Sequence, residues 1–470
     1  METVWYNENQ KDKMKSEANI MDDKQEQKFR QMTQEPVEGL ICRLAVPCII
    51  SMLVTSFYNM ADTFFVGLLQ SNAATGAVGV VYPLMAIIQA VGFLFGQGSG
   101  NYISRCLGQK NREEAEVMAS TGFFSALFTG LVICVLGLTF LEPLSYLLGS
   151  TDTILPHTEA YLRAILIGAP WMTASLVLNN QLRLQGSASY AMVGITTGAV
   201  LNIVLDPVMI FGMNLGVAGA GWATIISQFV SFCMLLMGCA KGGNIRIRFR
   251  NFRLKLFYYK KILEGGLPSL ARQSLQSLAT ICLNHAAGPY GDAAIAAMGV
   301  VQRVMMFGAS TMLGFGQGFQ PVCGFNYGAR LYSRVKQGFW FCVKISTVVL
   351  TAIGALGFFF APQIISVFRD NPAVIDFGAA ALRFQFVTFP LHGFIVMSTM
   401  MEQAIGRTAS ATFLSVARQG CFFIPAVLIL PLVLQETGVQ MAQSVADVLT
   451  ILCAVPIHLH VLKSLPKTDG

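Results

Sequence analysis

Long apolar runs separated by short polar breaks dominate the chain from about residue 41 to residue 462. A helix of about 20 apolar residues can cross a hydrocarbon core about 30 Å thick, and the runs have roughly this length. The pattern therefore predicts an all-α polytopic membrane protein with twelve transmembrane helices. Gly, Pro and charged residues place these helices near residues 41–66, 75–98, 117–140, 157–178, 188–210, 217–239, 262–286, 294–318, 340–360, 374–400, 409–433 and 441–462.

The amino-acid composition favours the same class. Of the 470 residues, 54% are hydrophobic and only 12% are charged, and the mean hydropathy is +0.57. A soluble protein would carry about 25% charged residues. The 11 cysteines are scattered without a CxxC pair, so neither disulfides nor a zinc site is expected. His458 and His460 lie two residues apart at a helix end, and this spacing does not predict zinc binding either.

Lys and Arg occur in alternate connections between the predicted helices. Only Arg369 departs from this alternation. Basic residues in short loops are retained in the cytoplasm, so the alternation predicts that both termini are cytoplasmic. The connections that contain neither Lys nor Arg are 67–74, 141–156, 211–216, 287–293 and 434–440.

Polar segments flank the helices and join their two halves. Residues 1–39 mix charges of both signs and contain no apolar signal-peptide core, so we expect a disordered cytoplasmic tail. The basic stretch 241–261 is expected to be a cytoplasmic linker beside anionic lipid rather than a nucleic-acid-binding arm. Residues 463–470 form a short cytoplasmic C-terminus.

The sequence matches itself at an offset of 220 residues. The stretch FGQGSG at 95–100 aligns with FGQGFQ at 315–320. The repeat predicts two pseudo-symmetric six-helix lobes, an N-lobe at 40–240 and a C-lobe at 262–462, related by an axis along the membrane normal. Further pairs at this offset are Gly108 with Gly328, Phe140 with Phe360, Arg163 with Arg383, Pro170 with Pro390 and Gly186 with Gly406.

The repeated glycines are expected to permit close contact between helices. A phosphate-binding loop is not expected, because no strand precedes them and no Lys-Ser/Thr follows. No Walker motif occurs elsewhere in the sequence, so no nucleotide is expected. The mirrored Arg163 and Arg383 indicate a shared structural or gating role rather than substrate selection.

Two acidic residues interrupt the apolar runs of the first lobe. Asp62 lies in YNMADTFFVG, and Asp206 lies in LNIVLDPVMIFG one helical turn after Asn202. At the 220-residue offset neither acid has an acidic counterpart. A carboxylate in a low-dielectric site either takes up a proton or holds a cation. With a hydroxyl from Thr224, these residues predict an oxygen-rich site for Na⁺ or for a shared proton.

Simpler interpretations remain open at this stage. Asp62 could be a solvent-exposed acid near a helix end, and Pro207 after Asp206 could mark an ordinary kink. The other polar residues inside the predicted spans are weaker signals, and several are expected to form pairs in the second lobe. These residues are Arg272, Arg303, Glu402 and Arg418.

From residue 40 to residue 462, the sequence resembles the multidrug and toxic compound extrusion (MATE) family, and most closely its MepA-like bacterial branch. The resemblance is most specific in YNMADTFFVG, GQGSGNYISRCLGQKNREEAE, LRLQGSASYAM, LNIVLDPVMIFG and AIGRTASATFLSVARQ. It implies a twelve-helix, two-lobe antiporter that expels organic cations in exchange for Na⁺ or H⁺. The implied cation site is Asp62, Asn202, Asp206 and Thr224, and the implied cavity residues are Tyr58 and Asn179.

Relatives in the NorM-like branch use acids in the seventh and tenth helices. Here the seventh helix, with LPSLARQSLQSLA, contains no acid, and the tenth has only Asp376 at its outer edge. Coupling through the second lobe of that kind is therefore not expected.

The function expected from these features is secondary active efflux rather than enzyme catalysis, and no cofactor is expected. The implied partners are organic cations and the bilayer of a bacterial inner membrane, with the chain acting as a monomer. The rival hypothesis is a lipid-linked oligosaccharide flippase, which would use Arg272, Arg303 and Arg418 to bind pyrophosphate. A membrane hydrolase would need a nucleophile–base set or metal ligands, and a passive channel would not explain a buried acid pair.

Overall fold

The computed structural model describes residues 23–69 and 71–469. Within these ranges all regular secondary structure is helical, as the hydropathy pattern predicts. The α-helices are α2 (Val37–Gly67), α3 (Asn72–Gly108), α4 (Arg112–Thr139), α5 (Leu141–Leu147), α6 (Leu155–Leu184), α7 (Ala188–Pro207), α8 (Gly216–Cys239), α9 (Leu256–Ala287), α10 (Asp292–Gly328), α11 (Tyr332–Phe359), α12 (Ala361–Phe368), α13 (Pro372–Thr388), α14 (Leu391–Ile405), α15 (Thr408–Val416), α16 (Ile424–Leu434) and α17 (Glu436–Ser464). The remaining segments are the π-helices η1 (Val208–Gly212) and η4 (Ala417–Phe423) and the 3₁₀ turns η2 (Phe249–Asn251) and η3 (Gly288–Tyr290).

Ten helical stretches in the described part of the chain are long and apolar enough to cross a membrane. The pair α13 and α14 qualifies when its two helices are taken together, although they bend by 58° at a short break. α9 has a comparable length of 32 residues but is more polar. The structure therefore supports a multi-pass helical membrane protein.

Several helices are longer than the hydropathy pattern predicts. α3 continues past residue 98 to Gly108, and α10 continues past residue 318 to Gly328. Both extensions contain polar residues, which can prolong a helix beyond the bilayer without an apolar signal. Shortly afterwards Lys110 and Arg330 adopt positive φ angles of 56° and 60°, which helical residues do not have.

Two short helices that the hydropathy pattern does not predict occupy equivalent places in the repeat. α5 begins at Leu141 and α12 begins at Ala361, directly after the matched pair Phe140 and Phe360. With 7 and 8 residues they are too short to produce a transmembrane pattern. Their positions extend the internal repeat from the sequence to the secondary structure.

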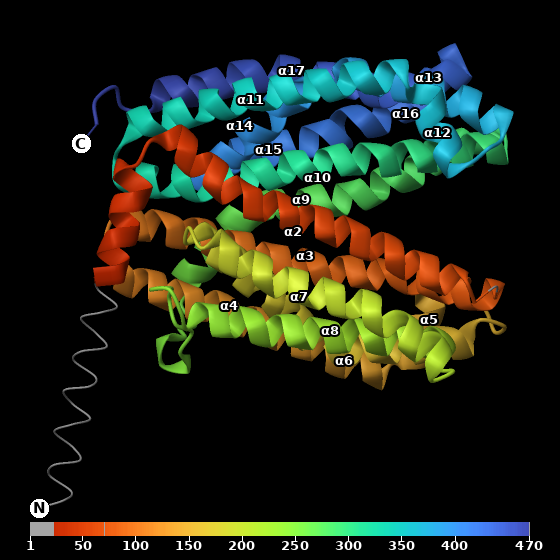
Figure 1. Cartoon of the computed structure of the whole chain (residues 1–470), viewed down its shortest axis with the longest axis horizontal. Helices are drawn as coiled ribbons and strands as arrows, with labels where there is room; N and C mark the ends of the chain where they lie inside the picture. Colours follow the sequence, from red (N-terminus) through yellow and green to blue (C-terminus); the bar gives the residue numbers. More distant parts are fainter. Residues whose placement is uncertain (1–22, 70, 470) are drawn as a thin grey trace, which may run out of the picture.

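The helices lie roughly side by side along the long axis of the molecule (Figure 1). α4 to α8 form the lower part of this view and α9 to α17 the upper part, with α2 and α3 running between them. α3 packs on α4, α6 and α9, whereas α2 packs on α7 and α10. We call α2 to α8 the first group and α9 to α17 the second group. The first described helix and the C-terminal residues lie at the same end of the molecule, which we call the terminal end.

The two groups approach each other closely near the terminal end. A Cβ atom on Gly98, in the FGQGSG stretch, would overlap the backbone carbonyl of Ile262. The Arg183 side chain crosses the same boundary, because its Nη1 donates to the carbonyl of Gln317 at 3.1 Å and to Gln320 Oε1 at 3.0 Å. This arrangement confirms that the motif glycine permits close helix contact rather than forming a phosphate loop.

The segment 1–39 is not disordered throughout. Residues 23–34 form a helix, so the prediction is wrong for this part, and residues 1–22 lie outside the described residues. The mixed charge of the segment suggested a solvated tail. However, Met32 and Thr33 are only 1% and 6% exposed, so the helix packs against the rest of the protein.

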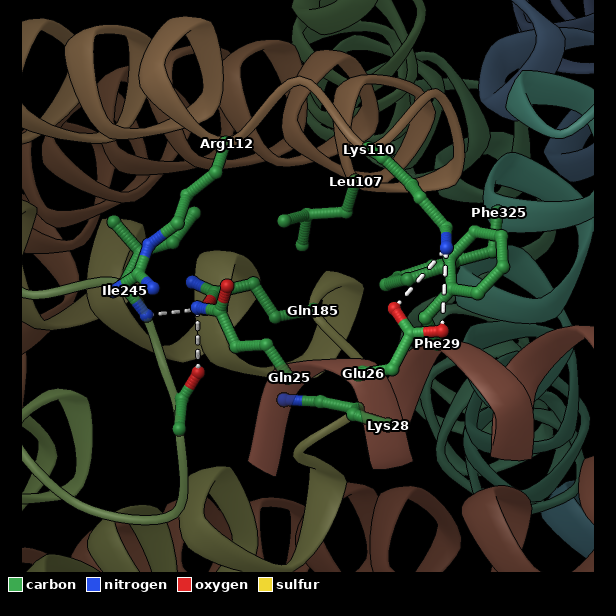
Figure 2. A pocket seen from close by; sticks show the side chains of 11 residues that line it. Gln25, Glu26, Lys28, Phe29, Leu107, Lys110, Arg112, Gln185, Ile245 and Phe325 are labelled. Carbon is green, nitrogen blue, oxygen red and sulfur yellow. Dashed lines mark hydrogen bonds and ion pairs between the residues drawn. The ribbon is translucent and has the colours of Figure 1, made fainter. Parts of the chain in front are cut away.

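Hydrogen bonds tie this N-terminal helix to both groups at the terminal end. Lys28 Nζ donates to Ser187 Oγ at 2.6 Å and to Asn244 Oδ1 at 2.8 Å. On the other side, Asn326 Nδ2 of α10 donates to the carbonyl of Met32 at 3.0 Å. Figure 2 shows the cavity of about 260 Å³ between this helix and the ends of α3 and α4, with Lys28 among its lining residues.

Parts of the basic linker predicted at 241–261 pack on the first group. The Ile245 N–H donates to Gln185 Oε1 at 2.8 Å, and the Arg253 N–H donates to Thr121 Oγ1 at 3.2 Å. Residues 256–261 belong to α9, so the helical part of the second group begins earlier than predicted.

Candidate functional site

Three helices of the first group bring the predicted polar residues together. Asp62 lies on α2, Asn202 and Asp206 lie one turn apart on α7, and Thr224 lies on α8. α7 packs against both α2 and α8, so their polar positions meet inside the first group. Asn202, Asp206 and Thr224 are 1%, 0% and 2% exposed, so all three side chains are buried.

The Asn202 amide links Asp206, on the same helix, to Thr224 on α8. Its Nδ2 lies 3.3 Å from Asp206 Oδ1 and 3.5 Å from Thr224 Oγ1. Rotating the Asn202 side-chain amide by 180° gives it better hydrogen-bond partners. In that orientation Nδ2 donates to Asp206 Oδ2 at 3.2 Å, and the side-chain carbonyl accepts the Thr224 backbone N–H at 3.3 Å. In both orientations Asn202 fixes the position of the Asp206 carboxylate.

Asp62 faces this cluster from α2. Its side chain is partly buried, and its Oδ1 is buried without a hydrogen-bond partner among the described residues. The Asp62 carboxylate is close enough to interact electrostatically with that of Asp206. The structure therefore brings the two predicted acids together rather than leaving Asp62 as an isolated acid at a helix end.

The cluster offers hard oxygen ligands: two carboxylates, an amide carbonyl and a hydroxyl. Two neighbouring carboxylates repel each other unless a proton or a cation is bound, and hard cations prefer oxygen ligands of this kind. Within the described residues, neither acid interacts with a Lys, Arg or His side chain. The residues present, and the unpartnered oxygen of Asp62, fit a site for Na⁺ or a shared proton.

Tyrosine and glutamine side chains surround the acids. Tyr58, one turn before Asp62 on α2, interacts with both carboxylates and with Gln228 of α8. Tyr161 of α6 also faces both acids and is only 1% exposed. Sequence reasoning missed Tyr161 and Gln228, although Gln228 lies one turn after Thr224 and could have been found from that spacing.

The structure does not place Asn179 in this cluster. Asn179 lies on α6, and its Nδ2 donates to the backbone carbonyl of Ala191 on α7 at 3.3 Å. This contact joins two helices of the first group and involves neither acid. A role for Asn179 in the cavity rests on the family resemblance alone.

Buried acids also occur in the second group, at positions that do not correspond to Asp62 or Asp206 in the repeat. Glu402 on α14 is 0% exposed, and Asp447 on α17 is 1% exposed. The sequence predicts a pairing role for Glu402 but not for Asp447, because the offset comparison asked only whether Asp62 and Asp206 had acidic counterparts. No local motif marks either residue as buried and paired.

The expected pairing of polar residues in the second group is correct in part, but the partners differ. Glu402 Oε1 lies 3.0 Å from His458 Nδ1, and Arg418 Nε donates to Asp447 Oδ1 at 2.8 Å. Arg303 is exposed, as are the mirrored Arg163 and Arg383. Neither Asp447 nor the His458 pairing was predicted from the sequence.

The bundle of apolar helices and its buried oxygen-rich cluster define a polytopic helical membrane protein of the transporter class. The family model described as MatE matches residues 47–208 and again residues 268–429, so the chain belongs to the MATE family. The double match also confirms the internal repeat.

Curated relatives place the chain in the MepA-like branch of the family. Multidrug export protein MepA from Staphylococcus aureus (strain NCTC 8325 / PS 47) is 26% identical over 428 residues, which cover 90% of this chain and 94% of the relative. MepA from Staphylococcus saprophyticus is 27% identical over 417 residues, which cover 88% and 91%. The similarity therefore extends over nearly the whole length of both relatives.

Solved structures share the fold. A MATE structure in complex with MaL6 has a TM-score of 0.87 and 26% identity, covering 94% of this chain and 99% of the other. An outward-facing conformation of a multidrug resistance MATE family transporter of the MOP superfamily has a TM-score of 0.87 and 27% identity, covering 93% and 98%. The chain is thus a multi-pass helical membrane transporter.

Proposed function

We propose that this protein is a secondary active exporter of lipophilic organic cations, driven by exchange for Na⁺ or H⁺. The observation that carries the proposal is the fully buried Asp206 facing Asp62, with no basic side chain from the described residues to neutralise the pair. The printed names of the MepA relatives, multidrug export proteins, support the same assignment.

The proposed transporter has twelve spans in two six-helix lobes, with the N-lobe at 40–240 and the C-lobe at 262–462. The ten apolar helices, the bent pair α13–α14 and the long helix α9 support this number. The alternation of basic loops supports cytoplasmic termini in a bacterial inner membrane. On this assignment, the terminal end with its close contacts between groups is the cytoplasmic end.

Exchange requires that the occupied and empty acid cluster favour different arrangements of the lobes. Na⁺ would be held by the carboxylates of Asp62 and Asp206, the Asn202 carbonyl and the Thr224 hydroxyl. A proton would be shared between the two carboxylates. One-for-one exchange of monovalent cations moves no net charge and is driven by the ion gradient alone, whereas each additional Na⁺ or H⁺ that crosses 100 mV would contribute about 2.3 kcal/mol.

The organic cation is proposed to bind beside this cluster. The Tyr58 ring offers an aromatic face to a cation, and it adjoins both acids. Asn179 is proposed as a further cavity residue on the basis of the family resemblance. The flippase alternative is less well supported, because Asp447 neutralises Arg418 and Arg303 is exposed, which leaves Arg272 of the three arginines expected to bind pyrophosphate. The transporter is proposed to act as a monomer.

Ethidium efflux from vesicles tests the proposal, with Na⁺ and pH gradients imposed separately. We expect one of the two gradients to drive efflux by the wild type, and Asp206→Asn to abolish that dependence. Asp376→Asn, which changes an exposed acid of α13, serves as the matched control and should behave as wild type. Undiminished gradient-driven efflux by Asp206→Asn would exclude the proposed coupling site.

A further inference from the structure

A second buried charged cluster lies in the second group, where three helical segments meet at irregular positions. His392 is near the start of α14, directly after the 58° break from α13. Arg418 lies in the π-helix η4, and Asp447 lies on α17. π-helices and broken membrane helices are frequent at functional sites, because their freed backbone groups require local compensation. The proposed coupling cluster uses none of these residues.

The Asp447 carboxylate is saturated with donors. Arg418 Nε donates to Oδ1 at 2.8 Å, and Gln443 Nε2 donates to the same oxygen at 3.0 Å. Thr388 Oγ1 donates to Oδ2 at 3.4 Å. Asp447 is 1% exposed and already paired with a guanidinium, so a cation at this carboxylate would have to displace Arg418. His392 is the member of this cluster whose protonation state can change.

His392 Nε2 lies between two partners that make opposite demands. It is 2.8 Å from Asp447 Oδ2 and 2.8 Å from Arg418 Nη2. A guanidinium can only donate and an ionised carboxylate can only accept. A neutral His392 with a lone pair on Nε2 can accept from Arg418 but meets the carboxylate with its lone pair. A His392 with a proton on Nε2 can donate to Asp447 but directs its N–H at the guanidinium.

We propose that His392 is a proton-binding site whose protonation exchanges its hydrogen-bond partner from Arg418 to Asp447. Arg418 then loses its Nη2 contact while Nε remains on Asp447, so the guanidinium turns about this remaining bond. The Arg418 side chain is 25% exposed, which leaves it room to turn, whereas those of His392 and Asp447 are 8% and 1% exposed. The bistable element is therefore Arg418 within η4, next to the α13–α14 break.

The surroundings of His392 contain few other groups that could set its protonation. The charged groups that interact with it are Arg418 from η4 and Asp447 from α17. The ring of Phe389 packs edge-on at 5.3 Å, and no further ionisable group from the described helices packed on α14 is among its electrostatic partners. The protonation of His392 is therefore set by its contacts with Arg418 and Asp447.

This inference goes beyond the proposed exchange, because it predicts sensitivity to protons whether the coupling ion is Na⁺ or H⁺. The direct test is ¹⁵N NMR of the histidine rings in the purified full-length protein between pH 5.5 and 8. The His392 signals are assigned by their loss in His392→Gln. At high pH we expect the tautomer with a bare Nε2, and at low pH the doubly protonated ring. An Nε2–H tautomer throughout this range would overturn the proposal.

Arg418→Gln sharpens the test without removing the histidine. Because the Arg418 guanidinium, which can only donate, is absent in this variant, His392 at high pH should change to the Nε2–H tautomer that donates to Asp447. A bare Nε2 that persists in this variant would contradict the partner exchange. The measurement needs no transport, so its failure is distinguishable from failure of the proposed efflux function.

Transport provides a second readout at equal pH on both sides of the membrane. With an imposed Na⁺ gradient or membrane potential, we expect the wild-type efflux rate to change severalfold between pH 5.5 and 8, and this change to be clearly smaller in His392→Gln, where only the acid cluster still responds to pH. His458→Gln is the matched control, because His458 is also buried and paired with an acid, Glu402. A wild-type pH profile in His392→Gln, or a flat profile in His458→Gln alone, would overturn the proposal.

Discussion

Gly108 and Gly328 occupy equivalent positions in the repeat, and each lies against the backbone of the other group. A Cβ on Gly108 would overlap the carbonyl of Phe325, and a Cβ on Gly328 would overlap the carbonyl of Arg105. Arg105 and Phe325 are themselves equivalent at the 220-residue offset. The contact is therefore reciprocal, as expected where two similar units meet around a two-fold axis. This relationship supports the two-lobe arrangement more directly than the sequence repeat does.

Replacing Gly108 by alanine should hold this end of the molecule apart, because backbone carbonyls cannot move aside as a flexible side chain can. If efflux requires the end to close, we expect at least a tenfold lower ethidium efflux rate at equal expression. Gly328→Ala should have the same effect, since its contact is equivalent. Gly299→Ala is the control, because nothing lies within 4 Å of a Cβ there. Normal efflux by both Gly108→Ala and Gly328→Ala would show that the contact is dispensable.

The sequence predicts the helical architecture well because apolar length is a local property. It does not predict where α3 and α10 end, because polar residues interrupt their apolar runs before the helices end. The helix at residues 23–34 was missed for a related reason. Its stability comes from contacts with distant segments, such as Lys28 with Asn244, rather than from its own composition.

The candidate site could be predicted only as a set of residues. The spacing of Asn202 and Asp206 shows that both lie on one face of one helix. The approach of Asp62 from α2 depends on tertiary packing, which the sequence alone does not show. The same limit hid the cluster of the second group. His392 and Asp447 are 55 residues apart in the chain, and only the packing of α14 on α17 joins them.

Binding of the coupling ion should stabilise the purified protein through the acid cluster. A ligand at 100 times its Kd contributes about 2.7 kcal/mol to the free energy of unfolding. We therefore expect a saturating concentration of the coupling ion, added Na⁺ or protons, to raise the Tm of the wild type by several degrees. Asp62→Asn should lose most of this shift, whereas Asp376→Asn should keep it. Equal shifts in all three proteins would place the ion elsewhere.

Tyr58 should contribute to cation binding through its ring rather than its hydroxyl. A cation–π contact of about 0.5–2 kcal/mol corresponds to roughly a 2- to 30-fold change in affinity. We expect Tyr58→Phe to keep the wild-type KM for ethidium efflux and Tyr58→Leu to raise it by a factor in that range. The maximal rate should change less than KM. A raised KM in Tyr58→Phe as well would assign the effect to the hydroxyl and its neighbour Gln228.

Lys28 should make the stability of the protein depend on pH. Burial lowers the pKa of the Lys28 ammonium from its usual 10.5 to about 7. Between these values the unfolded chain binds the proton more tightly than the folded protein does, so raising the pH from 7 towards 10 should stabilise the fold through this residue, while below pH 7 its contribution should be constant. We expect the Tm of the wild type in detergent to rise with pH relative to that of Lys28→Met. Lys24→Met, which changes an exposed lysine of the same helix, should follow the wild type. A Lys28→Met profile parallel to that of the wild type would mean that Lys28 keeps its charge in the folded protein, solvated by the hydroxyl of Ser187 and the amide of Asn244.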